Sequence, residues 1–104
     1  MNTLTLLKEA RKVIAKPDNW TQGANARDEY GDTVSTVSSD AVCWCWLGSL
    51  VRVSGGDDEA RYTAQLALQE DLHGCITATN DSHTHTEVMK AFDFTIARLE
   101  KAAA

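Results

Sequence analysis

A run of ten residues near the middle of the chain, Val42–Val51, contains almost no polar side chains. A helix built from such a run has no face suited to water, so it must be buried on all sides. We therefore predict a central helix over residues 41–53, with Ser39 or Asp40 as its N-cap. Glycine costs a helix interior about 1 kcal/mol relative to alanine. Gly48 therefore indicates that another element approaches this helix closely.

Patterns on both sides of this run predict three further helices. Apolar residues recur at three- and four-residue steps over residues 3–16, and Pro17 ends that helix because proline pushes the preceding residue out of helical geometry. The acids of residues 57–59 suit the positive end of a third helix, which follows the stop signal Gly55-Gly56. Thr84-His85-Thr86-Glu87 has the form of a capping box and marks the start of the last helix.

Residues 17–38 break the helical periodicity and contain a hairpin signal. The segments 26–30 and 33–37 flank Gly31-Asp32, a two-residue turn in which glycine supplies a positive φ. A lone hairpin is only marginally stable, so it must pack against the helices. We expect the packing side chains to be Trp20, Tyr30 and Val34.

The fold class that follows is mainly α. We predict a single domain over residues 1–104, with about four helices packed around a central buried helix and a small β-hairpin inserted after the first helix.

Charge and composition exclude several classes of partner. The 15 acidic and 10 basic residues give a net charge of -5, which disfavours nucleic acid, because phosphate binding needs lysine and arginine. No apolar stretch approaches the roughly 18 residues of a membrane helix. The residues before Lys8 include no basic side chain, so we expect no signal peptide. The three cysteines, an odd number, favour a reducing compartment. We expect a cytoplasmic protein that binds neither nucleic acid nor membrane.

Histidine and cysteine supply six candidate metal ligands, but their spacing does not favour a site. No pair has the C-x-x-C spacing, and on a helix Cys43 and Cys45 would point to different faces. We predict that the protein binds no metal and no cofactor. A zinc-stabilised module remains an alternative, with ligands drawn from Cys43, Cys45, His73, Cys75, His83 and His85.

A Cys–His nucleophile, such as Cys45 with His85, is a further alternative. A helix N-terminus lowers a thiol pKa, but a thiol among tryptophans is more often an inert core residue. The polar loop at Asn80-Asp81 could instead bind a ligand before the last helix. The candidate ligand or partner site therefore comprises Trp20, Gln22, Arg27, Cys45, Asn80, Asp81 and His85.

A series of short motifs follows a fixed order over nearly the whole chain. The motifs are Trp20-Thr21-Gln22-Gly23, Ala26-Arg27-Asp28, Cys43-Trp44-Cys45-Trp46-Leu47-Gly48-Ser49-Leu50, Asn80-Asp81, and Thr84-His85-Thr86-Glu87-Val88 with Phe92-Asp93. In this order they resemble a family of small bacterial and bacteriophage proteins classed as a domain of unknown function. The resemblance implies no activity that could be carried over to this chain.

The function that we favour from sequence is a non-catalytic protein-interaction module. Three tryptophans are more than one small core readily hides, and tryptophan is enriched in interfaces. The partner would be another protein or a second copy of the chain in a homodimer. A small-molecule-binding protein or a Cys/His-dependent enzyme is the alternative, and a polar pocket around the second helix would favour it.

Overall fold

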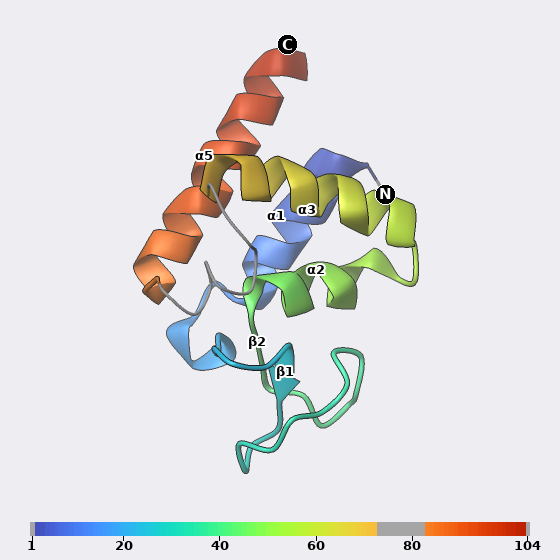
Figure 1. Cartoon of the computed structure of the whole chain (residues 1–104), viewed down its shortest axis with the longest axis vertical. Coiled ribbons are helices and arrows are strands. Elements are labelled where there is room, and N and C mark those ends of the chain that lie inside the picture. The colour runs from blue at the N-terminus through green and yellow to red at the C-terminus, as the bar shows by residue number, and fades with distance from the viewer. Residues whose placement is uncertain (1, 73–82, 104) are drawn as a thin grey trace.

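The elements of the fold follow one another in an order close to the expected one. A computed structural model describes residues 2–72 and 83–103. In this part of the chain the elements are helix α1 (Thr3–Val13), a short 3-10 helix η1 (Pro17–Asn19), strands β1 (Ala26–Arg27) and β2 (Cys43–Trp44), and helices α2 (Trp46–Ser54), α3 (Asp58–Leu72) and α5 (His85–Ala103) (Figure 1). Over these described residues the fold is mainly α, with four α-helices and a small antiparallel strand pair after the first of them.

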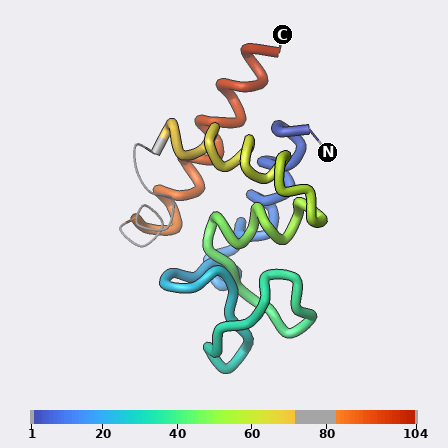
Figure 2. The backbone as a smooth tube through the Cα atoms, turned by 45° about the vertical axis from the view of Figure 1, so that its right-hand side comes forward, coloured from blue at the N-terminus to red at the C-terminus, as the bar shows by residue number. Residues whose placement is uncertain are grey.

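The four helices share one hydrophobic core. Helix α1 packs against α2, α3 and α5, and α3 packs against both α2 and α5. The strands and the loop between them extend from the helical body beside α2 (Figures 1 and 2). The largest fully buried apolar side chains come from all four helices and from the residue after α1: Leu6, Leu7, Ile14, Trp46, Leu50, Leu68, Val88 and Phe92.

Helix α2 is the most enclosed of the helices, as its sequence predicts. Every residue of α2 is buried or half-buried, whereas α1, α3 and α5 each carry exposed residues. The centre of the domain is nevertheless shared, because α1 and α3 each pack against all three other helices.

The predicted start of α2 is wrong by five residues. The helix was expected from Ala41, with Ser39 or Asp40 as its cap, but it begins at Trp46, and Cys45 is the N-cap. The sulfur of Cys45 accepts a hydrogen bond from the backbone N–H of Gly48 at 3.3 Å. The residues before Cys45 are extended and pair with β1. A continuous apolar run has no periodicity that would separate a buried strand from a buried helix.

The predicted hairpin is displaced at its turn and has the wrong second strand. Gly31 has the expected positive φ, 82°, but the turn is not the two-residue Gly31-Asp32 turn. Asp28 and Asp32 close it around residues 29–31: the N–H of Asp28 donates to the carbonyl of Asp32 at 2.9 Å, and the N–H of Gly31 donates to the carbonyl of Asp28 at 3.0 Å. Only one bridge, between Arg27 and Thr33, continues this pairing. The main partner of β1 is β2, with Ala26 opposite Trp44, and this pairing places two buried residues side by side.

Two of the three side chains expected to anchor the hairpin do so. Trp20 and Val34 are half-buried against the core. The third expectation is wrong, because Tyr30 is 81% exposed.

The capping box before α5 is confirmed. The N–H of Glu87 donates to the hydroxyl of Thr84 at 3.2 Å, and the N–H of Thr84 donates to the carboxylate of Glu87 at 3.0 Å. We expect Thr84→Ala to lower the free energy of unfolding by about 1 kcal/mol, because the N–H of Glu87 loses its acceptor. Thr84→Ser keeps the oxygen and should lose much less. Urea unfolding of the three proteins measures both, and equal losses would contradict a capping role.

The contribution of this capping box to stability should depend on pH, because the carboxyl group of Glu87 can be protonated. Hydrogen bonds from the backbone and then the side chain of Thr84 hold the pKa of the Glu87 carboxyl below its ordinary value of 4.5. A lowered carboxyl pKa stabilises the fold above the unfolded-state pKa, and this contribution disappears as the pH falls through the folded-state value. The parent should therefore melt at a higher temperature than Glu87→Gln at neutral pH. The gap should close on acidification below 4.5, and a constant gap would contradict this assignment.

Candidate functional site

Three of the predicted site residues lie together where the end of α1 meets the start of α5. The ring Nε2 of His85 donates to the backbone carbonyl of Ile14 at 2.7 Å. The same ring packs edge-on against Trp20, with 5.7 Å between ring centroids. The side-chain amide of Gln22 donates to the carbonyl of His83 at 2.9 Å. These contacts connect segments that are far apart in sequence.

Arg27 lies beside this group and serves the loop backbone. Its guanidinium donates to the carbonyl of Gly31 at 3.0 Å and to that of Gln22 at 3.3 Å. Because both acceptors are backbone carbonyls of neighbouring turns, the arginine fixes how the chain enters and leaves β1.

Cys45 takes different partners from His85. It is buried, its sulfur caps α2, and its thiol lies 3.5 Å from the side-chain oxygen of Asn25, to which it donates. The two members of the Cys–His pair considered from sequence thus each have a structural contact of their own.

The remaining predicted site residues, Asn80 and Asp81, lie outside the described residues. Within residues 2–72 and 83–103, no three histidine, cysteine, aspartate or glutamate side chains are grouped so that they could hold a metal ion. In the same part of the chain no helix combines the length and the apolar character needed to cross a membrane.

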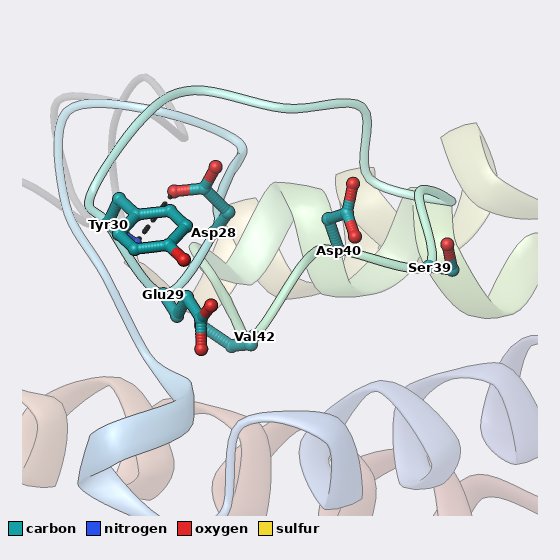
Figure 3. A pocket seen from close by; sticks show the side chains of 6 residues that line it. All are labelled: Asp28, Glu29, Tyr30, Ser39, Asp40 and Val42. Atoms are coloured by element: carbon teal, nitrogen blue, oxygen red, sulfur yellow. Dashed lines mark hydrogen bonds between the residues drawn. The ribbon is translucent and has the colours of Figure 1, made fainter.

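Sequence reasoning missed a surface on residues 28–42, the segment that leads from β1 to β2 and that we call the projecting loop. Its side chains include Tyr30 (81% exposed), Val37 (65% exposed) and the less exposed Val42. An open cavity of about 450 Å³ lies in this loop (Figure 3). Its lining residues are Asp28, Glu29, Tyr30, Ser39, Asp40 and Val42.

Hydrogen bonds hold the first half of the projecting loop in a defined conformation. One carboxylate oxygen of Asp28 accepts the backbone N–H groups of Tyr30 and Asp32, both at 2.9 Å. This arrangement closes the turn on which Tyr30 is displayed. A sequence signal existed, since an aromatic residue inside an acidic turn is a poor candidate for a core position.

The second half of the loop is bound by side chains from the body of the domain. The indole N–H of Trp44 donates to the carbonyl of Thr36 at 2.9 Å. Arg52 of α2 donates to the carbonyls of Thr36 at 3.1 Å and Ser38 at 3.2 Å. These bonds order the loop by connecting its backbone to β2 and α2.

Fold and site together define a small helical domain that carries an ordered, partly apolar loop on one side. The chain belongs to DUF6197, a family of unknown function, whose model matches residues 1–98. This confirms the resemblance to a domain family of unknown function. No curated protein and no solved structure matches the chain.

Proposed function

We propose that the protein is a non-catalytic protein-interaction module and that the projecting loop is its binding surface. The observation that carries this proposal is the exposure of Tyr30, Val37 and Val42 on a loop that is already ordered by hydrogen bonds. Aromatic side chains dominate the energetics of interfaces. A loop that is ordered before binding loses less conformational entropy when a partner is bound.

The tryptophans do not provide this surface, although the sequence argument relied on them. Trp46 is fully buried and Trp44 nearly so, and Trp20 is half-buried against the core. The exposed aromatic of the projecting loop is instead a tyrosine. We further propose that the partner is a different protein and that binding takes place in the cytoplasm. A homodimer is the outcome that would replace a different protein as the partner.

The proposal is tested by crosslinking and reconstitution. A photo-crosslinking amino acid at position 37 should capture a partner in the cells that produce the protein, and the captured protein is then purified. In calorimetric titrations with that protein, Tyr30→Ala should weaken binding by about tenfold or more, which is the scale of an interface anchor. Melting temperature should hardly change, because the removed ring is 81% exposed.

The matched control is Tyr62→Ala, which removes a 53% exposed tyrosine from α3. This variant should bind within about twofold of the parent if the projecting loop is the interface. Equal losses in the two variants, or no binding between the purified proteins, would contradict the proposal. Crosslinking of the chain only to itself, with a dimer in sedimentation, would show the homodimer.

A further inference from the structure

The cavity in the projecting loop combines an aromatic ring, an aliphatic side chain and carboxylates. Figure 3 shows Tyr30, Glu29 and Val42 on one side of the cavity and Ser39 and Asp40 on the other. Its volume of about 450 Å³ is in the range of sites that accept a side chain or a small ligand. The apolar part offers contact area, and the polar part determines which chemistry can enter.

The charge of the loop has one sign. Residues 28–51 contain no lysine, arginine or histidine, and the loop carries the carboxylates of Asp28, Glu29, Asp32 and Asp40. The arginines on either side, Arg27 and Arg52, donate to backbone carbonyls. In the part of the chain that the structure describes, no basic side chain forms an ion pair with a loop carboxylate. The apolar surface is therefore surrounded by unneutralised negative charge.

We infer that the occupant of this surface is a basic segment of the partner protein, with an arginine side chain in the cavity between Tyr30 and Asp40. This inference rests on the proposed function and names the chemistry of the partner. A basic segment complements the negative charge of this surface, which also offers apolar contacts. Nucleic acid and anionic lipid carry the same sign of charge as the loop, so they do not fit it.

Arginine matches the cavity better than lysine does. Its planar guanidinium stacks on an aromatic ring and donates to carboxylates at the same time, and its aliphatic stem can lie against Val42. The carboxylate of Asp40 is available for this pairing, because within the described residues only the backbone N–H of Asp40, not its carboxylate, takes part in the loop's hydrogen bonds. An ammonium group offers charge but no planar face.

The test uses the full chain and short synthetic peptides. The probes are acetyl-Ala-Arg-Ala-amide, the same peptide with citrulline, which is neutral and nearly isosteric with arginine, and the same peptide with lysine. In NMR titrations the arginine peptide should give saturable amide shifts concentrated in residues 28–30 and 39–42. The citrulline peptide should bind at least about fivefold more weakly, since it has no charge to pair. The affinity of the lysine peptide should lie between those of the arginine and citrulline peptides.

A pair of variants locates the pairing. Asp40→Asn should weaken binding of the arginine peptide by about threefold or more. Asp18 is an exposed acid of η1 outside the cavity, so Asp18→Asn should leave this binding unchanged. The inference is overturned if the arginine peptide gives no saturable shifts or if it binds no more tightly than the citrulline peptide. It is also overturned if the lysine peptide binds more tightly than the arginine peptide, or if Asp40→Asn binds the arginine peptide as tightly as the parent does.

The same variants test the proposed function separately from the inference. If Tyr30→Ala weakens binding of the purified partner and Asp40→Asn does not, the projecting loop remains the interface and only the inference about arginine is wrong. If the purified partner does not bind the parent chain, the proposed function itself is wrong.

Discussion

Replacing Leu50 with alanine is expected to lower the free energy of unfolding by about 2–5 kcal/mol. Leu50 is fully buried in α2, the most enclosed helix, and its side chain belongs to the core that all four helices share. Truncation removes its apolar contacts and leaves a cavity that the surrounding helices can only partly close. A domain of this size is stable by only about 5–15 kcal/mol, so the variant should be close to unfolding at physiological temperature.

The matched control lies three residues earlier in the same helix. Leu47 is half-buried at the edge of the core, so Leu47→Ala should cost clearly less than Leu50→Ala. Urea unfolding with an unchanged m-value gives both differences on one scale. A loss of less than about 1 kcal/mol for Leu50→Ala, or equal losses for the two leucines, would contradict the burial of α2 described above.

The features that the sequence predicted well depend on residues close to one another along the chain. Gly55 has a φ of 61° and ends α2. The side chain of Asp57 accepts the N–H of Ala60 at 3.0 Å and starts α3. The capping box at Thr84 starts α5. Caps and stops involve neighbours within about four residues, so they can be recognised without knowledge of the tertiary structure.

The features that were missed depend on distant partners. Residues 43–44 are extended because they pair with β1, Cys43 with Arg27 and Trp44 with Ala26, and not because of any local preference. The local pattern therefore placed them in the helix. Tertiary packing overrides propensity in short segments, and an all-apolar run gives no signal of where one element ends and the next begins.

The candidate site shows the same division. Trp20, Gln22 and His85 lie together, but the hydrogen bonds that hold His85 and Gln22 are made to the backbone carbonyls of Ile14 and His83. Because every residue type has a backbone carbonyl, no sequence motif identifies these acceptors. The exposure of Tyr30 was missed because aromatic residues are usually expected inside.

Gly48→Ala is the variant for which helix propensity and packing predict opposite signs. Alanine favours a helix interior by about 1 kcal/mol over glycine, so propensity alone predicts a more stable protein. In the structure, however, a Cβ on Gly48 would overlap the backbone carbonyl of Asn25. That carbonyl also accepts the N–H of Cys45 at 3.3 Å, which holds it against the first turn of α2.

The clash cannot be relieved by a side-chain movement, because the obstructing atoms belong to the backbone. The loop that carries Asn25 must move away from α2, and the hydrogen bond at Cys45 must then lengthen or break. We therefore expect a net loss of about 1–3 kcal/mol in the free energy of unfolding, with faster hydrogen exchange at the Cys45 amide. Thr63→Ala on the exposed side of α3 also raises helix propensity and meets no clash. It removes only an exposed hydrogen bond to the carbonyl of Glu59, so it should not destabilise the protein in this way. A Gly48→Ala protein as stable as its parent would show that Asn25 does not press on α2, and that this glycine is a tolerated weakness of the helix.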